Sequence, residues 1–358
     1  MGFCRVRFNN FRNIEPREMK WCPGLNLLTG NNGSGKTNIL EGINIISGWG
    51  PLERGTKTAS LPTWNSGSNE VQLTGQLEGD NGEIIKVKIS DRYSIKFEEK
   101  QIRAPELRWK VPVLSFLPND VAIIESSASY RRRLLDMILA LLIPPYAVRL
   151  NDYRRGIKQK AIILRRGEST DIINRVLMPL ALWIWKMREE CILLLSECIN
   201  NVDFAASSHV DLFLKRGGAG VLESPEDDYL NAISANEERE SVIKIPLVGP
   251  HRDDLVINVD NCRAASESLS RGYRRRIAIA LILAASDGVY RKLGKEPILL
   301  LDEVTAELDP EGKEVLFKSL IKRKAQVFAA TAEPYAGVFP GSTYDINAGR
   351  VEKINEYQ

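Results

Sequence analysis

The sequence has few of the residues that build zinc sites, disulfide frameworks and histidine-based catalytic centres. Only two of its 358 residues are histidines, His209 and His251, and no Ser/His/Asp arrangement is visible around them. The five cysteines are odd in number, scattered and never spaced as CxxC: Cys4, Cys22, Cys191, Cys198 and Cys262. This pattern argues against a zinc ribbon or a disulfide scaffold and fits a reducing cytoplasm.

Long apolar runs are also missing. The longest uncharged apolar stretch near Trp183 runs from Val176 to Trp185, which is too short to cross a bilayer. The chain opens with the charged run MGFCRVRF, so we expect neither a signal peptide nor a membrane span. The net charge is only +3, and any affinity for nucleic acid must therefore come from local basic clusters.

The order of predicted elements indicates an α/β core interrupted by a helical part. Strands are predicted at Cys4–Phe8 and Leu25–Thr29, and a hairpin between Val71 and Ile89 turns at Asp80-Asn81-Gly82. Helix formers fill residues 129–201, where Pro144-Pro145 and Pro179 interrupt the pattern and favour a compact lobe over a coiled coil. An acidic stretch, 217–240, reads as a surface hairpin or helix leading to a strand at Ile243–Val248. We expect three segments: 1–112 and 246–358 as core, and 113–245 as a mainly helical insertion.

The strongest motif is GNNGSGKT, which lies between a predicted strand and a predicted helix as a P-loop requires. Its glycines let backbone N–H groups face phosphates, Lys36 would reach the β- and γ-phosphates, and the Thr37 hydroxyl would bind Mg²⁺. The alternative is a chance glycine-rich turn. The predicted ATP-binding residues are Gly30, Asn31, Asn32, Gly33, Ser34, Gly35, Lys36 and Thr37.

A second motif, ILLLDE at 298–303, is an apolar strand that ends in two carboxylates. It reads as a Walker B strand, in which Asp302 would hold Mg²⁺ and Glu303 would polarise the attacking water. Taken alone, the pattern also suits a strand end that caps the next helix. Together the two motifs predict Lys36, Asp302 and Glu303 as catalytic residues, and Thr37 with Asp302 as the Mg²⁺ ligands.

Between these motifs, Leu269-Ser270-Arg271-Gly272-Tyr273 precedes an apolar helix and resembles the ABC signature sequence. Glu307-Leu308-Asp309 follows Walker B in the place of a D-loop. In ABC-class proteins, signature donors reach the nucleotide of a second protomer, which implies that Ser270 and Gly272 contact ATP across a two-fold dimer. A plain helix N-cap is the alternative role of Ser270.

Basic residues gather in two places. The segment from Arg131 to Arg166 contains ten arginines and lysines but only two acidic residues, Asp136 and Asp152. A second basic cluster, Arg271 and Arg274 to Arg276, flanks the signature serine. Binding to a phosphate backbone is one use of such clusters, and a solvated helix face is the other. The predicted DNA-binding residues are Arg131, Arg132, Arg133, Arg154, Arg155, Lys158, Arg274 and Arg275.

Several strings together resemble the RecF family over nearly the whole chain: FNNFRN at 8–13, GNNGSGKTNILEGI at 30–43, YRRRLLD at 130–136, YRR at 153–155 with Lys158-Gln159, and GPHRDD at 249–254. The resemblance implies an ABC-type ATPase head, with an antiparallel side sheet and an inserted helical domain. It further implies ATP-dependent homodimers, binding of double-stranded DNA near gaps, slow ATP hydrolysis, and work with RecO and RecR to load RecA. Arg12 would approach the nucleotide phosphates, unless it is a surface arginine.

The chain also departs from the family pattern. Tyr273 stands where the signature usually has glutamine, Asp302-Glu303 where Asp-Asp is common, and Asn119 where glutamate is common. Thr331 lies near the place of the ABC switch histidine, and no Q-loop glutamine can be assigned. We therefore expect slow turnover. The rival interpretations are a nearly non-hydrolysing nucleotide-binding scaffold that tethers repair partners, and a transporter cassette, which the helical insertion and GPHRDD disfavour.

Overall fold

The computed structural model describes residues 2–53, 55–79, 82–203, 209–220, 224–260, 269–332 and 341–355. The chain forms two compact units. The core unit comprises Met1–Val121, Val202–Phe204 and Ser270–Gln358, and the arm unit comprises Ala122–Asn201 and Ala205–Leu269.

A largely parallel sheet forms the centre of the core unit, with strand order β14-β13-β3-β12-β11-β8. All neighbouring strands run parallel except β13 and β14. Strands β8, β11 and β12 are buried on both faces, and their residues are mostly apolar, as is typical of parallel strands. The strands are β3 (Leu25–Thr29), β8 (Val113–Phe116), β11 (Ile298–Leu301), β12 (Val327–Ala330), β13 (Ser342–Asn347) and β14 (Arg350–Asn355).

A second, antiparallel sheet of the core unit has the order β2-β1-β4-β5-β6-β7. Its strands alternate between buried and exposed residues, so one face packs inward and the other faces solvent. The predicted hairpin is the pair β4–β5, although its turn at Asp80-Asn81 lies outside the described residues. The strands are β1 (Phe3–Asn9), β2 (Glu18–Lys20), β4 (Val71–Leu77), β5 (Ile84–Ile89), β6 (Tyr93–Phe97) and β7 (Lys100–Gln101).

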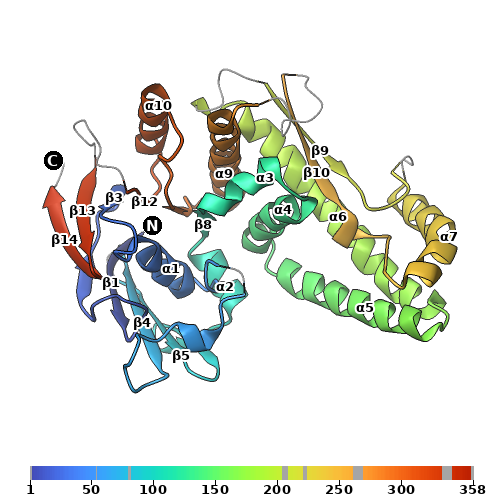
Figure 1. Cartoon of the computed structure of the whole chain (residues 1–358), viewed down its shortest axis with the longest axis horizontal. Helices are drawn as coiled ribbons and strands as arrows, with labels where there is room; N and C mark the ends of the chain where they lie inside the picture. The colour runs from blue at the N-terminus through green and yellow to red at the C-terminus, as the bar shows by residue number, and fades with distance from the viewer. Residues whose placement is uncertain are drawn as a thin grey trace. The chain divides into compact units, whose positions relative to one another are not determined.

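Helix α1 (Lys36–Ile46) lies between the two sheets, in contact with β4 and β5 on one side and with β11 and β12 on the other (Figure 1). A side chain at Gly42 would meet the Phe8 ring, so this glycine lets helix and side sheet approach closely. The remaining helices of the core unit are α2 (Ala104–Lys110), α9 (Arg271–Leu293) and α10 (Pro310–Ile321). The predicted α/β core with an antiparallel side sheet is thus confirmed.

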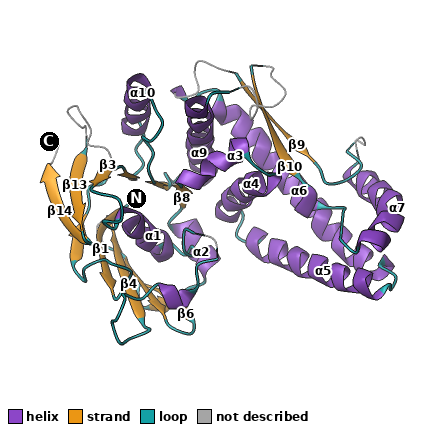
Figure 2. Ribbon diagram, in the orientation of Figure 1, coloured by secondary structure: helices purple, strands orange, loops and turns teal. Residues whose placement is uncertain are grey.

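The arm unit is mainly helical, as predicted (Figure 2). Helices α4, α5 and α6 pack on one another, and the antiparallel strands β9 and β10 contact α6 and α4. The elements are α3 (Ala122–Glu125), α4 (Ala128–Leu142), α5 (Tyr146–Arg166), α6 (Asp171–Ile199), β9 (Val210–Lys215), α7 (Pro225–Ile243) and β10 (Asp254–Val259).

Three features of the arm unit differ from the sequence predictions. Helix α6 continues through Pro179, because the helix on either side of one missing N–H is long and well packed. The predicted strand at Ile243–Val248 is wrong, since α7 runs to Ile243 and ends at Lys244, which has left-handed backbone. Residues 254–259, predicted as core, form β10 and pair with β9 in the arm unit, because their alternating apolar side chains are buried there.

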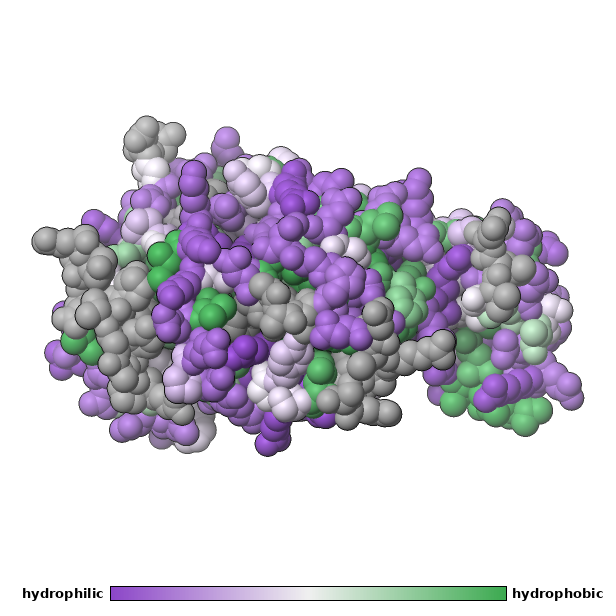
Figure 3. Space-filling model, turned by 90° about the horizontal axis from the view of Figure 1, so that it is seen from above, coloured by the Kyte–Doolittle hydropathy of each residue, from purple (hydrophilic) through white to green (hydrophobic). Residues whose placement is uncertain are grey.

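Hydrophilic side chains cover most of the described surface in the view of Figure 3. Within the described ranges no helix is long and apolar enough to cross a membrane.

Candidate nucleotide site

The P-loop joins β3 to α1 and has the backbone that the glycines were predicted to supply. Gly30, Gly33 and Gly35 have φ values of 141°, 78° and 118°, in the region that favours glycine. A Cβ atom at Gly30 would lie 2.2 Å from the carbonyl oxygen of Ile346. Lys36 Nζ donates to the Gly30 and Asn31 carbonyl oxygens at 2.7 and 2.9 Å, and burial lowers the pKa of this lysine. The loop thus holds its lysine inward, within reach of a phosphate.

The two Walker motifs meet through a hydrogen bond. Thr37 Oγ1 donates to Asp302 Oδ2 at 2.8 Å, and Asp302 is only 3% exposed. The second carboxylate oxygen, Oδ1, is buried and has no hydrogen-bond partner among the described residues. Burial is the first cause of the raised pKa of Asp302. A buried carboxylate oxygen with open coordination beside a hydroxyl fits Mg²⁺, which takes few protein ligands and completes its shell with phosphate and water.

A pocket opens at this edge of the sheet. It is lined by Asn32, Gly33, Gly35, Lys36, Thr37, Asn38, Asp302 and Glu303. Glu303 is exposed, and its backbone lies in the left-handed region with φ 48°, which costs a non-glycine residue roughly 1–2 kcal/mol. The fold thus brings residues from around positions 30 and 300 of the chain into one pocket, and their roles toward ATP and Mg²⁺ stay predictions. Among the described residues no group of three or more His, Cys, Asp or Glu side chains is arranged to hold a metal ion.

Helix α9 begins at the predicted signature. Ser270 is its N-cap and accepts from the Tyr273 backbone N–H at 3.4 Å, as a helix-capping serine does. Gly272 approaches the segment after β11 so closely that an added Cβ would lie 3.0 Å from the Glu307 carbonyl oxygen. Asp309 caps α10 by accepting from Gly312 N at 3.1 Å. The contact of Ser270 and Gly272 with a partner's ATP stays a prediction.

Three arginines of α9 bind the segment that follows Walker B. Arg271 forms an ion pair with Glu307 at 3.5 Å, Arg276 pairs with Asp309, and Arg275 donates to the Glu303 carbonyl oxygen. Arg275 is 4% exposed and lies over the Phe116 ring, and burial lowers its pKa. Its assignment to DNA binding is therefore corrected: the arginine contacts the segment that carries Glu303, because helical periodicity turns it away from the surface.

Arg12 is held by an ion pair with a buried carboxylate. Its guanidinium donates to both carboxylate oxygens of the buried Glu41, at 2.8 and 3.2 Å, and to the Ser60 carbonyl oxygen. It is not among the residues that line the pocket. Contact between Arg12 and phosphate would require this bidentate pair to open, and it stays a prediction.

Sequence reasoning missed Asn13, the neighbour of Arg12. Its Nδ2 donates to the Gly33 and Ser34 carbonyl oxygens at 3.3 and 3.4 Å, and its Oδ1 accepts from Asn38 at 2.8 Å. Asn13 thereby ties the end of the FNNFRN string to the P-loop. The FNNFRN string was the signal that could have pointed to Asn13. It resembles the family pattern, but it does not say which residues Asn13 contacts.

Thr331, near the place of the ABC switch histidine, is buried at the end of β12. Its hydroxyl shares a hydrogen bond of 2.8 Å with Thr305, two residues after Glu303. The position therefore connects two core segments and offers no titratable group to the pocket.

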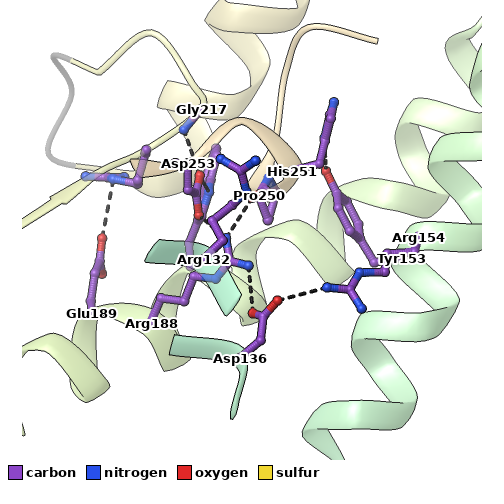
Figure 4. A network of polar contacts seen from close by, with 12 residues as sticks. Arg132, Asp136, Tyr153, Arg154, Arg188, Glu189, Gly217, Pro250, His251 and Asp253 are labelled. Atoms are coloured by element: carbon purple, nitrogen blue, oxygen red, sulfur yellow. Dashed lines mark hydrogen bonds and ion pairs between the residues drawn. The ribbon is translucent and has the colours of Figure 1, made fainter. Parts of the chain in front are cut away.

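The GPHRDD string lies in the arm unit, and Figure 4 shows three of its residues, Pro250, His251 and Asp253, within a network of polar contacts. Gly249 has φ 122°, and a Cβ there would lie 2.3 Å from Tyr153 Oη. His251 Nε2 donates to the Pro246 carbonyl oxygen, so Nδ1 accepts from the Tyr153 hydroxyl at 2.8 Å. Burial lowers the pKa of His251 to about 4, and the ring is neutral near pH 7.

Asp253 is the centre of this network. Its Oδ1 accepts from Trp185 Nε1 and from Gly217 N, each at 2.8 Å, and its Oδ2 accepts from Arg188 at 2.6 Å. The buried Arg188 guanidinium reaches on to Asp136 Oδ1 at 2.8 Å (Figure 4). The next residue, Asp254, pairs with Arg131 through two bonds. The string therefore ties α4, α5, α6 and the loop after β9 into one body.

Some arginines of the basic cluster at 131–166 are part of this network, and others are exposed. Arg131 is held by Asp254, and Arg132 donates to the Asp253 carbonyl oxygen at 2.5 Å, so both have structural roles. Arg154 is exposed but bridges to Asp136 at 2.9 Å. Arg155 and Lys158 are exposed on α5, and Arg155 forms a loose ion pair with Asp152 at 3.8 Å. These two, with the half-buried Arg133, remain candidates for a phosphate backbone.

The family described as "AAA domain" matches residues 5–139. The chain is 28% identical to the DNA replication and repair protein RecF of Heliobacterium modesticaldum, covering 98% of this chain and 99% of that protein. It is 27% identical to the protein of the same name from Geobacillus thermodenitrificans, covering 92% of each.

Two solved structures share the fold. The recombination mediator protein RecF-ATPrS of the RecFOR pathway matches with a TM-score of 0.87 at 23% identity, over 99% of this chain and 98% of that one. An Smc head bound to the C-winged helix domain of ScpA matches with a TM-score of 0.61 at 13% identity, over 99% and 97%. The fold is that of RecF and Smc heads, and the resemblance to the RecF family predicted from the motifs is confirmed.

Proposed function

We propose that this chain is an ATP-dependent DNA-binding protein of recombinational gap repair that works in the cytoplasm. The observation that carries the proposal is the hydrogen bond between Thr37 and Asp302, which joins both Walker motifs around a pocket edged by Glu303. The kinship with proteins named for DNA replication and repair supports the choice among the ATPases that share these motifs.

ATP would enter this pocket with its phosphates against the P-loop. Lys36 would leave the Gly30 and Asn31 carbonyl oxygens and neutralise phosphate charge, while loop N–H groups bind the same oxygens. Thr37 and the open oxygen of Asp302 would hold Mg²⁺, which neutralises charge on the phosphates when it is bound. Glu303 would orient and polarise the attacking water, so hydrolysis would be slow without a well-placed carboxylate.

The N-terminus of α9 supports a dimer in which each protomer contacts the other's nucleotide. A helix N-terminus attracts anions, and Ser270 and Gly272 lie at the start of α9. In the proposed homodimer, ATP bound by one protomer meets Ser270 of the other, and binding of double-stranded or gapped DNA follows from exposed arginines and lysines such as Arg155 and Lys158. The chain would work with RecO and RecR to load RecA on single-stranded DNA.

Sedimentation velocity tests this proposal with wild type, Ser270→Arg and a control. The control is Ser241→Arg, which places the same side chain on an exposed position of the arm helix α7. We expect wild type and the control to dimerise with ATP and Mg²⁺, and Ser270→Arg to stay monomeric because the arginine fills the phosphate position. ATP-independent oligomers in all three would contradict the proposal.

The second candidate is a scaffold that binds nucleotide with almost no hydrolysis. Two departures from the family pattern favour it: Tyr273 stands where the signature usually has glutamine, and the buried Thr331, near the place of the switch histidine, shares its hydroxyl hydrogen bond with Thr305. DNA-stimulated ATP hydrolysis that disappears in Glu303→Gln would exclude the scaffold. Hydrolysis that is negligible in both wild type and Glu303→Gln would favour it.

A further inference from the structure

The segment after β11 contains two strained residues four positions apart, and both are held by α9. Glu303 and Glu307 have φ values of 48° and 59°. Arg275 donates to the Glu303 carbonyl oxygen, and Arg271, one helical turn earlier, pairs with the Glu307 carboxylate. Because residues four apart share a helix face, one face of α9 contacts both strained positions.

Arg275 is a buried cation whose guanidinium donates to a backbone carbonyl oxygen. Its guanidinium is almost wholly buried over the Phe116 ring, and its Nε has no hydrogen-bond partner among the described residues. Burying a cation with an open N–H is costly, and an apolar side chain of similar length would pack there more cheaply. What the arginine adds is the bond to the carbonyl of Glu303, which fixes the peptide plane after the predicted catalytic carboxylate.

We propose that Arg275 is a positioning residue that holds Glu303 in its left-handed backbone conformation and so couples ATP hydrolysis to the placement of the first turn of α9. This inference rests on the proposed function, because it assumes that Glu303 polarises water and that Ser270 meets a partner's nucleotide. Arg275 touches neither substrate nor metal. Its effect passes through the peptide of Glu303.

The coupling has a simple geometric route. A Cβ atom at Gly272 would lie 3.0 Å from the Glu307 carbonyl oxygen, so the start of α9 packs directly against the segment after β11. A γ-phosphate bound at Ser270 would fix the first turn of α9, and Arg275, in the second turn, would then fix Glu303. A protomer without a partner's nucleotide would hold its own carboxylate less firmly, and its hydrolysis would be slower.

The test measures ATP affinity and kcat on full-length protein with Mg²⁺ and duplex DNA. The variants are Arg275→Met, Arg275→Lys, Glu303→Gln and the double variant, with Lys292→Met at the exposed far end of α9 as control. We expect Arg275→Met to keep its ATP affinity and lose about 10- to 100-fold in kcat, as small misplacements of catalytic groups do. Arg275→Lys should recover part of the loss, and Lys292→Met should match wild type.

The double variant separates positioning from general damage. If Arg275 acts only through Glu303, adding Arg275→Met to Glu303→Gln lowers kcat no further. Specific activity should rise with protein concentration in wild type as dimers form, and stay flat in Arg275→Met. Additive losses, an unchanged kcat in Arg275→Met, or the same rise with concentration in both would overturn the inference. If Glu303→Gln hydrolyses ATP as fast as wild type, the proposed function itself fails, and this inference fails with it.

Discussion

Two buried aspartates, Asp302 in the core unit and Asp253 in the arm unit, are similarly hidden from solvent but differ in their partners. Asp253 is fully buried, and both its oxygens accept hydrogen bonds, from Trp185, Gly217 and Arg188. Asp302 is 3% exposed and accepts from Thr37 through Oδ2, whereas its Oδ1 has no hydrogen-bond partner among the described residues. A satisfied buried carboxylate stabilises the fold, whereas an open one beside a pocket is available to a ligand.

The same contrast divides the arginines. Arg188 bridges two carboxylates inside the arm unit, and removing any member would leave buried charge behind. The buried guanidinium of Arg275 donates to a single carbonyl oxygen, that of Glu303, next to the pocket. Buried polar groups in this chain therefore serve two different purposes, and mutation should tell them apart.

The largest effect should come from Asp253→Ala. The substitution leaves Arg188 buried with one carboxylate fewer and breaks the bonds to Trp185 and Gly217, so we expect a loss of about 3–5 kcal/mol in the free energy of unfolding. Urea unfolding followed by tryptophan fluorescence measures it. A loss below about 1 kcal/mol, the size of an exposed pair, would remove the distinction between the two aspartates.

The next effect concerns pH. Burial lowers the pKa of His251 to about 4 from 6.5, so the unfolded chain takes up the proton first as the pH falls. The stabilisation is complete above pH 6.5 and is lost between pH 6.5 and 4, in total about 3 kcal/mol. His251→Gln keeps a donor toward the Pro246 carbonyl but does not titrate. The difference in unfolding free energy between wild type and variant should therefore shrink across that window, and parallel pH curves would contradict the prediction.

The smallest effect on stability should come from Asp302→Asn. Without nucleotide, this substitution removes a charge whose burial is only partly compensated, so we expect the free energy of unfolding to stay the same or rise by about 1 kcal/mol. Thermal unfolding of the nucleotide-free protein provides the measurement. A drop similar to that of Asp253→Ala would show that Asp302 has a structural role.

Local patterns in the sequence indicated which residues of the core unit would meet, although their roles stay predictions. The P-loop and the Walker B strand are each a short string with a fixed relation to strand and helix, and the parallel sheet brings Thr37 and Asp302 together. Strand β9 was missed, and the end of α7 was misread as a strand, since short apolar runs do not distinguish helix ends from strands.

The network around GPHRDD could not be predicted, because its partners are remote in the sequence. Trp185 and Arg188 lie 68 and 65 positions from Asp253, and Tyr153 lies 98 from His251. A cluster of arginines in the sequence also carries no information on burial. Arg131 and Arg275 looked like DNA contacts, and only the fold shows that both are held by their own chain.

The most direct measurement is ATP affinity as a function of Mg²⁺ concentration, in wild type, Asp302→Asn and, as a control for the Glu303 carboxylate, Glu303→Gln. The open oxygen of Asp302 predicts that affinity rises with Mg²⁺ in wild type and in Glu303→Gln, and that Asp302→Asn loses this dependence while still folding. The same Mg²⁺ dependence in Asp302→Asn and wild type would contradict the account, because Asp302 would then be one more buried aspartate that only holds the fold.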